Sequence, residues 1–239
     1  MTITRRRLLA SGAAAGLILP LAAGCAGPAR APGSSLPDTG RRVFLHGVAS
    51  GDPDAESVVL WTRAAPAAGA SGFDPDDGPV QVDWFLYADA ALTRRVARGS
   101  TTTSGRVDWT VKVLPRGLDA GTSYYFYFES GGERSSVGRT RTLPGQGIER
   151  VRMAVASCSN WPFGFFNVYG QIAARNDLDL VLHLGDYIYE YDNHTYGDGT
   201  RFGRFHSPDR EIVSLADYRT RYAQYRTDPD LLELHRQHP

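Results

Sequence analysis

The sequence predicts an antiparallel β-sandwich followed by the first strand–helix–strand part of an α/β domain. Seven short strand-like runs, separated by Gly, Pro and Asp, occupy roughly the stretch from residue 42 to residue 143 without a convincing helix. After the turn-forming Pro144–Gly147, apolar runs instead alternate with a helical pattern. With 239 residues, the chain has room for both parts.

The first part is typical of a sandwich of the fibronectin or immunoglobulin type. The segment Leu118–Tyr124 has the spacing of a tyrosine corner, in which the phenol binds back to the preceding turn. A helix over Ala88–Arg98 is the alternative, but Thr and Val interrupt its pattern. We expect strands at Val43–Val48, Ser57–Arg63, Val80–Tyr87, Arg94–Thr102, Val107–Leu114, Ser123–Glu129 and Ser135–Thr142.

The second part reads as strand, helix and strand, at Val151–Ala156, Gly164–Arg175 and Leu178–Leu184. That order predicts a parallel pair of strands. Two further helices are expected, one with a capping box from Ser214 to Asp217, and one beginning at Asp228-Pro229. We expect the first of these to present one face made of Leu215, Tyr218, Tyr222 and Tyr225.

The N-terminus has the composition of an export signal. Arg5-Arg6-Arg7 precedes an uncharged stretch rich in Ala and Gly, which indicates a twin-arginine signal peptide over residues 1–25. A transmembrane anchor is the alternative, but the stretch is short and diluted by glycine. Cys25 ends a run that resembles a lipobox, so it is a candidate for lipidation, and residues 26–41 read as a linker.

Charge excludes one class of partner. Acidic and basic residues balance at 26 each, so nothing indicates a nucleic-acid partner. We therefore expect an exported protein, periplasmic, cell-surface or secreted, that meets the twin-arginine machinery and contacts a membrane only through its signal or a lipid anchor.

The candidate metal ligands lie where the two predicted parallel strands end. Cys158 follows the first strand and Asp186 the second, and ligands bind at the carboxyl ends of such strands. A thiolate, a carboxylate and the phenols of Tyr187 and Tyr189 would repel one another unless a cation held them, which suits a hard metal such as ferric iron. The alternatives are a small buried cysteine, an ordinary Gly-Asp turn and packing tyrosines.

Other polar residues are weaker candidates. His194 and His206 lie in a Gly- and Arg-rich loop and are expected to be solvated. Arg201, Arg204 and His206 are nevertheless candidate contacts for a substrate phosphate, because arginine suits bidentate phosphate binding. His183 is expected to be a satisfied core histidine, and Asn160-Trp161 to border the pocket.

Three stretches resemble the PhoD-type alkaline phosphatase family. These are FLHGVASGDPDAESVVLWTR (residues 44–63), the strand end LHLGDYIYEY with Ala156-Ser157-Cys158 upstream, and EIVSLADYRTRYAQYRTDPDLLELH (residues 211–235). The resemblance implies a PhoD N-terminal sandwich over 42–143 and a calcineurin-like metallophosphoesterase domain over 150–239.

The resemblance also implies the site. It implies one ferric ion and two calcium ions, with Cys158 and Tyr189 as iron ligands and Asp186 bridging iron and calcium, while Tyr187 packs nearby. The reaction would be hydrolysis of phosphate monoesters, and of diesters in some members, by a metal-activated hydroxide. No residue of this chain is identified as the attacking group.

The family's remaining metal ligands fall in later motifs that this sequence does not contain, so we expect it to act as an N-terminal fragment, inactive alone. Two other functions stay open at this stage. One is a phospholipase-D-like phosphodiesterase on the same scaffold, and the other is a non-catalytic binding module of the cell envelope.

Overall fold

The computed structural model describes residues 43–65, 78–147 and 150–239. The predicted signal peptide, the linker and Cys25 lie outside these residues, so their predictions stay untested. The described residues belong to one compact unit. None of the helices in these ranges is long and apolar enough to cross a membrane.

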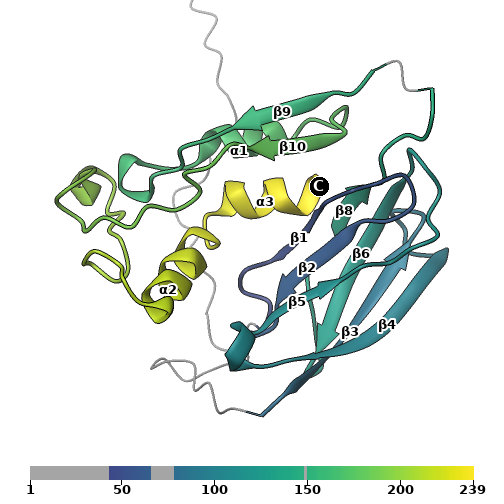
Figure 1. Ribbon diagram of the computed structural model, residues 1–239, viewed down its shortest axis with the longest axis horizontal. Helices are drawn as coiled ribbons and strands as arrows, with labels where there is room; N and C mark the ends of the chain where they lie inside the picture. The colour runs from purple at the N-terminus through teal and green to yellow at the C-terminus, as the bar shows by residue number, and fades with distance from the viewer. Residues whose placement is uncertain (1–42, 66–77, 148–149) are drawn as a thin grey trace, which may run out of the picture. The chain divides into compact units, whose positions relative to one another are not determined.

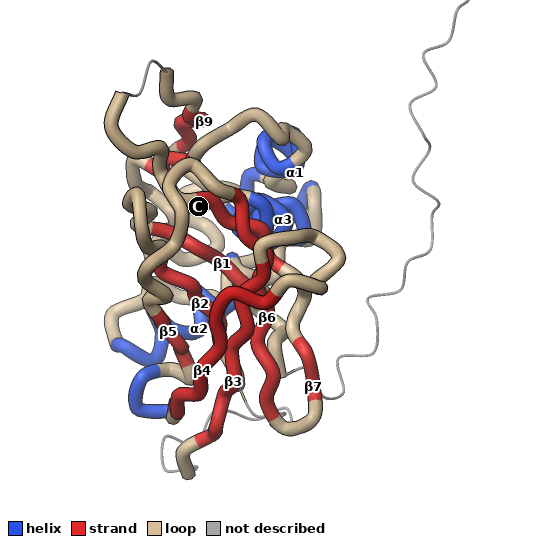
Figure 2. Tube along the Cα trace, turned by 90° about the vertical axis from the view of Figure 1, so that its right-hand side faces the viewer, coloured by secondary structure: helices blue, strands red, loops and turns tan. Residues whose placement is uncertain are grey.

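The first part is a sandwich of two antiparallel sheets (Figures 1 and 2). One sheet has the order β1-β2-β5, with β1 at Val48–Gly51, β2 at Val59–Arg63 and β5 at Thr110–Val113. The 3-10 turn η1, Gly105–Val107, leads into β5. The second sheet has the order β4-β3-β6-β7, and β8 also pairs with β6; its strands are β3 at Val80–Tyr87, β4 at Arg95–Thr103, β6 at Ser123–Ser130, β7 at Glu133–Arg134 and β8 at Gly138–Arg141.

The alternating inward residues of both sheets form one apolar core, which includes Val58, Leu60, Val82, Phe126 and Phe128. This packing of two antiparallel sheets confirms the predicted sandwich. The tyrosine corner is confirmed as well, because the main-chain nitrogen of Asp119 donates to the hydroxyl of Tyr124 at 2.8 Å. The helix considered for Ala88–Arg98 is absent there, since β4 begins at Arg95.

The strand predicted at Val43–Val48 is wrong over most of its length. Residues 43–46 form a turn, closed by a bond from the nitrogen of Gly47 to the carbonyl of Phe44 at 3.0 Å. Gly47 has φ +65, and a Cβ there would lie 2.9 Å from Cδ2 of Leu232. The apolar run therefore breaks at a position that requires glycine, and pairing begins only at Val48.

The second part contains the predicted parallel pair. Strand β9 (Met153–Ala156) runs parallel to β10 (Leu180–His183), with Ala156 opposite His183. The crossover carries the 3-10 turn η2 (Trp161–Phe163) and the helix α1 (Asn167–Ala173), both shorter than the predicted helix. Strand, helix and parallel strand agree with the predicted βαβ unit, and the calcineurin-like character of the whole domain stays a prediction.

After the turn η3 (Gly199–Arg201) come α2 (Leu215–Tyr225) and α3 (Pro229–Gln237). The capping box of Ser214 and Asp217 is confirmed, as is the Asp228 cap of α3. The predicted face of α2 is confirmed at Tyr225 but wrong at Leu215, which is 67% exposed. The buried residues of α2 are Asp217, Arg221 and Tyr225. Two of these are polar, so a search for apolar spacing could not find this face.

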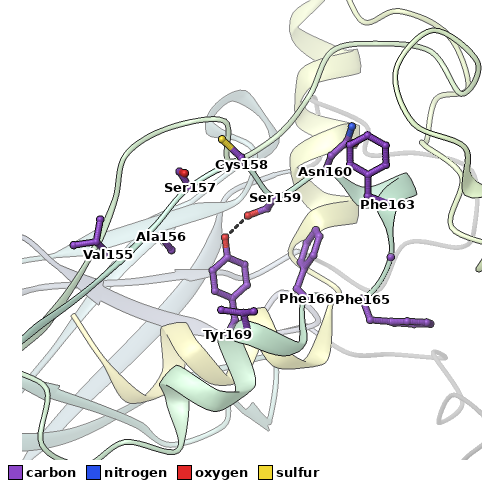
Figure 3. Close-up of a pocket in the computed structure, with 12 residues that line it drawn as sticks. Val155, Ala156, Ser157, Cys158, Ser159, Asn160, Phe163, Phe165, Phe166 and Tyr169 are labelled. Carbon is purple, nitrogen blue, oxygen red and sulfur yellow. Dashed lines mark hydrogen bonds between the residues drawn. The ribbon is translucent and has the colours of Figure 1, made fainter. Parts of the chain in front are cut away.

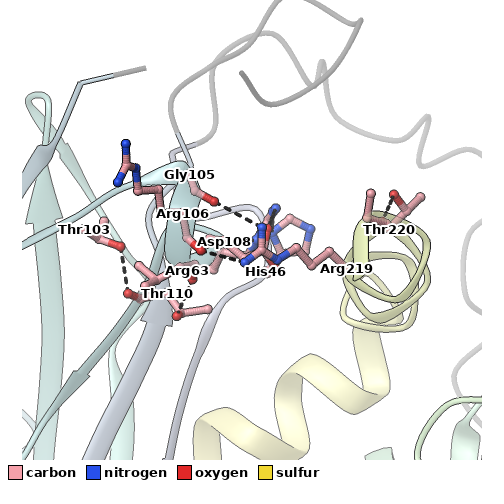
Figure 4. Close-up of polar contacts among 11 residues, drawn as sticks. His46, Arg63, Thr103, Gly105, Arg106, Asp108, Thr110, Arg219 and Thr220 are labelled. Carbon is pink, nitrogen blue, oxygen red and sulfur yellow. Dashed lines mark hydrogen bonds and ion pairs between the residues drawn. The ribbon is translucent and has the colours of Figure 1, made fainter. Parts of the chain in front are cut away.

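Arginines join α2 and α3 to the sandwich. Arg219 donates to the carbonyls of Gly105 at 3.3 Å and Arg106 at 2.7 Å, next to the pair of Arg63 and Asp108 (Figure 4). Arg236 donates to the carbonyl of Val137 at 2.9 Å. These bonds hold the C-terminal helices against the sandwich through main-chain carbonyls.

Candidate metal centre

The loops that follow β9 and β10 lie side by side. The main-chain nitrogen of Cys158 donates to the carbonyl of Gly185 at 3.1 Å, and that of Ser159 donates to the carbonyl of Asp186 at 3.0 Å. Both loops therefore leave the sheet as a hydrogen-bonded pair. The parallel register brings Cys158 and Asp186 to one edge, as the strand order predicted.

Both residues adopt a backbone conformation that side chains disfavour. Cys158 has φ +63 and Asp186 has φ +52, and Gly185 between the strand and Asp186 has φ +118. A left-handed conformation costs a residue with a side chain about 1–2 kcal/mol. Such strain persists where the surrounding structure enforces it, and it gathers at functional sites.

Two side chains, those of Cys158 and Tyr189, converge on one carboxylate oxygen of Asp186. The thiol of Cys158 lies 3.6 Å from Oδ2 of Asp186, and the hydroxyl of Tyr189 lies 3.1 Å from the same oxygen. Cys158 is exposed, whereas Tyr189 is buried. The site is thus open to solvent on the side of the thiol.

The electrostatics of this group favour a cation. Burial raises the pKa of the Tyr189 phenol, and its contacts with Cys158 and Asp186 raise it further. All three groups are anionic when deprotonated, and nothing cationic among their hydrogen-bond partners offsets that charge. A metal ion would reverse this electrostatic balance and hold the thiolate, carboxylate and phenolate together. The donor set therefore fits a hard cation.

No group of three His, Cys, Asp or Glu side chains in the described ranges is placed to hold a metal ion. The set found here contains only two such residues, and its third donor is a phenol. A search limited to the common ligand types would therefore pass over it.

A chain of hydrogen bonds joins the loop after β9 to the loop after β10. Ser159 bonds to the phenol of Tyr169 on α1 (Figure 3). That phenol also lies 3.0 Å from Nε2 of His183 on β10. The nitrogen of Gly185 donates to Nδ1 of His183 at 3.3 Å. The prediction of a satisfied core histidine is thus confirmed for the hydrogen bonds of His183 but not for the core, since the residue is only half-buried. Nothing in the sequence indicated that Tyr169 takes part in these hydrogen bonds.

Tyr187 points away from the candidate ligands. Its hydroxyl lies 2.9 Å from Nε2 of His235, and its ring stacks on Tyr222. Burial raises the pKa of this phenol. The tyrosine one position after Asp186 therefore packs, and the tyrosine three positions after it faces the site.

Arg221 shapes the chain that follows Tyr189. Its side chain is fully buried, and its nitrogens donate to five main-chain carbonyls, those of Tyr189, Tyr191, Ser207, Pro208 and Arg210. The bond to Tyr189 is fully buried and the other four are partly buried, so all five satisfy carbonyls of a folded loop. Arg221 thus fixes the loop that places the Tyr189 phenol, a role that sequence reasoning missed.

Two of the candidate substrate contacts are built into the protein interior. Arg204 is 6% exposed, bonds to Oδ2 of Asp228 at 3.0 Å and lies 3.5 Å over the ring of Trp161. His206 is 3% exposed and lies 3.1 Å from the hydroxyl of Tyr225. The expectation of a solvated His206 is wrong, because the loop folds inward, and the guanidinium of Arg204 is already paired inside the protein.

His194 is exposed, as expected, and Arg201 is exposed as well. Arg201 carries its guanidinium over the ring of Phe202, 5.0 Å from the centroid. A phosphate contact by Arg201 stays a prediction. Asn160 is buried, and Trp161 packs against Phe166 and Tyr225.

A cavity of about 310 Å³ opens beside Cys158. Asn160 borders it, as expected, together with Phe163, Phe165 and Phe166 (Figure 3). The rings of Phe163 and Phe165 are more than half exposed. The metal-ligand candidates therefore adjoin an aromatic surface.

Both parts of the chain are similar to known proteins. A family model described as "PhoD-like phosphatase, N-terminal domain" matches residues 29–144, and one described as "PhoD-like phosphatase" matches residues 153–239. Alkaline phosphatase D of Bacillus subtilis (strain 168) is 39% identical over 208 residues, which are 86% of this chain and 35% of that protein.

A solved structure described as "Structure of PhoD" is 38% identical, with a TM-score of 0.73, and the match covers 82% of this chain and 37% of that chain. The chain thus spans a little over a third of the length of these relatives, 35% and 37%. Both parts of the chain and the order in which they occur are shared with these proteins. The chain belongs to the PhoD-like phosphatase family.

Proposed function

We propose that the protein is an exported, metal-dependent phosphoesterase of the alkaline phosphatase D type, and that Cys158, Asp186 and Tyr189 form part of its metal centre. The observation that carries the proposal is the convergence of the Cys158 thiol and the Tyr189 phenol on Oδ2 of Asp186. Membership of the family supports the activity, and the donor types support the metal.

The family resemblance implies one ferric and two calcium ions, and the residues present fit part of such a centre. Cys158 and Tyr189 would hold iron, and Asp186 would bridge it to calcium. Bound there, the cations would polarise a phosphate ester and favour ionisation of an attacking water.

The chain's own residues prepare the site. The paired loops hold the thiol and the carboxylate at one edge, with both backbones in the left-handed region. Ser159, Tyr169 and His183 restrain these loops, and Arg221 restrains the chain after Tyr189. Ligands held in this way need little rearrangement when the cation binds, which favours affinity.

The test is hydrolysis of p-nitrophenyl phosphate by the full-length gene product that contains these residues, and by its variants, after loading with iron and calcium. Cys158→Ala, Asp186→Asn and Tyr189→Phe should each lower kcat/KM by about 10²-fold or more. The reason is that a metal centre stabilises the transition state by several kcal/mol. Asp209→Asn and Tyr218→Phe, which change exposed residues of the same types, should leave it unchanged. Full activity in Cys158→Ala would refute the assignment of the centre.

The same preparations separate the kinds of ester. Hydrolysis of bis(p-nitrophenyl) phosphate and of a phospholipid, measured beside the monoester, ranks the three substrates. We expect the monoester to be turned over fastest. A preference for phospholipid would favour the phospholipase-D-like alternative, and ligand binding without turnover or metal would favour the binding module.

Export by the twin-arginine route is part of the proposal. Replacing Arg5 and Arg6 with lysine should trap the protein in the cytoplasm, as measured by cell fractionation. Lipidation at Cys25 predicts a mature protein with a diacylglycerol-type mass increment that Cys25→Ser abolishes. A mature N-terminus downstream of residue 25 without that increment would contradict the lipid anchor.

A further inference from the structure

Exposed aromatic rings border the cavity beside Cys158. Phe163 and Phe165 line this cavity and are 56% and 58% exposed (Figure 3). The ring of Phe163 packs edge-on against Tyr196, with centroids 5.2 Å apart, and that of Phe165 packs edge-on against Phe202, with centroids 6.2 Å apart. Tyr196 and Phe202 are exposed as well. These four side chains form an aromatic wall.

The aromatic wall reaches the candidate metal centre at two points. The ring centroids of Tyr196 and Tyr189 lie 5.6 Å apart. Cys158 lines the same cavity as Phe163 and Phe165. Two of the three candidate ligands thus adjoin the wall, so a group attached to a phosphate at the metal centre would have the wall within reach.

Buried polar side chains fix the backbone that carries these rings. The amide nitrogen of Asn160, which is buried, donates to the carbonyl of Tyr196 at 3.2 Å. The guanidinium of Arg204, also buried, donates to the carbonyl of Trp161 at 3.1 Å and lies 4.8 Å from the ring centroid of Phe165. The rings are therefore presented on loops that are already ordered, which reduces the entropy lost when a ligand binds.

The cavity that the wall borders suits a neutral apolar group. Exposed apolar side chains that lie together mark interaction sites, because they leave apolar surface in contact with water. The volume of about 310 Å³ is at the lower end of the range for ligand pockets. Among the described residues that line the cavity, none is Asp, Glu, Lys, Arg or His. The cavity therefore has room for a ring-sized group and offers no ion pair to a second charge.

We propose that the aromatic wall binds the alcohol portion of the phosphate ester, and that this portion is a neutral aromatic group. The inference rests on the proposed function, because it takes the phosphate to be held by Cys158, Asp186 and Tyr189. The ring of the alcohol would pack offset or edge-on against Phe163 and Phe165, as aromatic pairs prefer. Aromatic rings also bind quaternary ammonium groups, so a choline ester is the alternative that the test must separate.

The test compares 2-naphthyl phosphate with glycerol 2-phosphate in the full-length gene product that contains these residues, loaded with iron and calcium. The readout is the ratio of the two kcat/KM values, in which damage to the metal centre itself cancels. Phe163→Ala and Phe165→Ala should each lower this ratio about tenfold, because only the aromatic ester loses an apolar contact. Phe205→Ala truncates an exposed ring that does not line the cavity, and it should leave the ratio unchanged.

Binding of the free alcohol gives a readout that needs no turnover. 2-Naphthol is titrated into the same preparations, and its fluorescence is followed. We expect saturable binding that Phe163→Ala and Phe165→Ala each weaken severalfold and that Phe205→Ala does not change. Absence of saturable binding, or the same affinity in all of these variants, would overturn the proposal.

The outcomes separate this inference from the proposed function. If neither ester is hydrolysed, the proposed function fails, and the titration with 2-naphthol still decides whether the wall binds an aromatic group. If both esters are hydrolysed and the ratio is unchanged in Phe163→Ala and Phe165→Ala, the wall is not the subsite. An unchanged ratio with a melting temperature lowered by several degrees would show that the rings pack within the full-length protein, which also overturns the proposal.

Phosphocholine, measured beside the two esters, tests the charge of the alcohol. We expect Phe163→Ala and Phe165→Ala to lower kcat/KM more for 2-naphthyl phosphate than for phosphocholine. The opposite order would assign the wall to a cationic alcohol and would overturn the neutral assignment.

Should either alanine variant fail to fold, Val168→Asp replaces it. Val168 lines the same cavity and is 68% exposed, so a charge there should lower the ratio of naphthyl to glyceryl ester without loss of the fold. An unchanged ratio in Val168→Asp would then refute the subsite.

Discussion

In the sandwich, the core between the sheets is made of apolar side chains such as Leu60, Phe126 and Phe128, none of which is exposed. In residues 150–239, the most buried side chains include Arg221 and Tyr225, while Val155 and Leu184 at the strand pair are more than half exposed. The first region gains its stability from apolar area removed from water. The second depends more on hydrogen bonds made by buried polar groups.

This difference suits the work of each region. The apolar core makes the sandwich a rigid support, to which polar contacts such as the tyrosine corner and the pair of Arg63 and Asp108 are added. A site built from strained loops needs many directional bonds to hold its ligands, and the second region supplies them through Arg221, Tyr169 and His183. Stability and function are thus supported by different residues, and substitutions can separate them.

The largest effect is expected in the sandwich core. Phe126→Ala should lower the free energy of unfolding by about 3–5 kcal/mol, because it leaves a cavity in a fully buried site. Chemical denaturation followed by tryptophan fluorescence measures this loss. Phe163→Ala, which truncates an exposed ring, should cost about 0.5 kcal/mol or less. Equal costs for the two variants would contradict the apolar character of the first region.

The next effect concerns the polar interior of the second region. Arg221→Met keeps most of the volume but leaves five main-chain carbonyls without their donor, so we expect a loss of about 3 kcal/mol. Thermal unfolding measures it, and metal affinity should fall in parallel because the Tyr189 loop loosens. Arg201→Met, at an exposed site, is the matched control and should change neither. A stable Arg221→Met would show that apolar packing also governs this region.

Acid should weaken the protein through its buried histidines. Burial lowers the pKa of His206 to about 4, with help from Arg221, and burial lowers the pKa of His46 to about 3. The unfolded chain takes up these protons near pH 6.5 and the folded protein does not, so stability is complete above pH 6.5 and falls as pH drops towards 4.

We expect the His206 contribution to be about 2 kcal/mol, smaller than the full shift implies because other groups relax. Denaturation measured from pH 7 to pH 4 gives the slope, and His206→Gln should flatten it. His194→Gln, at an exposed position, should leave the slope unchanged. A steeper dependence of stability on pH in His206→Gln would show that His206 is not a source of the acid sensitivity.

The smallest effect tests backbone strain at the site. Cys158→Gly should be more stable than Cys158→Ala by about 1 kcal/mol, because glycine adopts φ +63 without strain. At Ala156, in extended β9, glycine should instead destabilise by about 0.5–1 kcal/mol. Denaturation of the variants compares the two positions. If glycine changed the free energy of unfolding in the same direction at both positions, the backbone of Cys158 would not be strained.

Much of the fold was predictable because its signals are local. The sandwich strands follow alternation bounded by Gly, Pro and Asp, and the helix caps at Ser214 and Asp228 follow short-range bonding rules. The strand predicted before Gly47 failed because the chain turns there with φ +65, and the side chain that packs on Gly47 is Leu232 of α3, far along the sequence. Contacts of that separation leave no local pattern.

The candidate site was predictable only in part. Strand order sufficed to bring Cys158 and Asp186 together, and the family resemblance selected Tyr189 over Tyr187. The inward fold of Arg204 and His206 depends on Asp228 and Tyr225, which belong to later helices. Its place in a polar loop predicted that His206 is solvated, but its contact with Tyr225 buries it, and the ion pair with Asp228 likewise holds Arg204 inside.

Metal content is the measurement that tests the central claim most directly. The protein and its Cys158→Ala, Asp186→Asn, Tyr189→Phe and Tyr218→Phe variants would be incubated with ferric iron, freed of excess and analysed for bound metal and visible absorption. The account predicts bound iron with a phenolate absorption band in the protein and in Tyr218→Phe, loss of the band in Tyr189→Phe, and loss of iron in Cys158→Ala and Asp186→Asn. Iron content and absorption unchanged across all of these variants would contradict it.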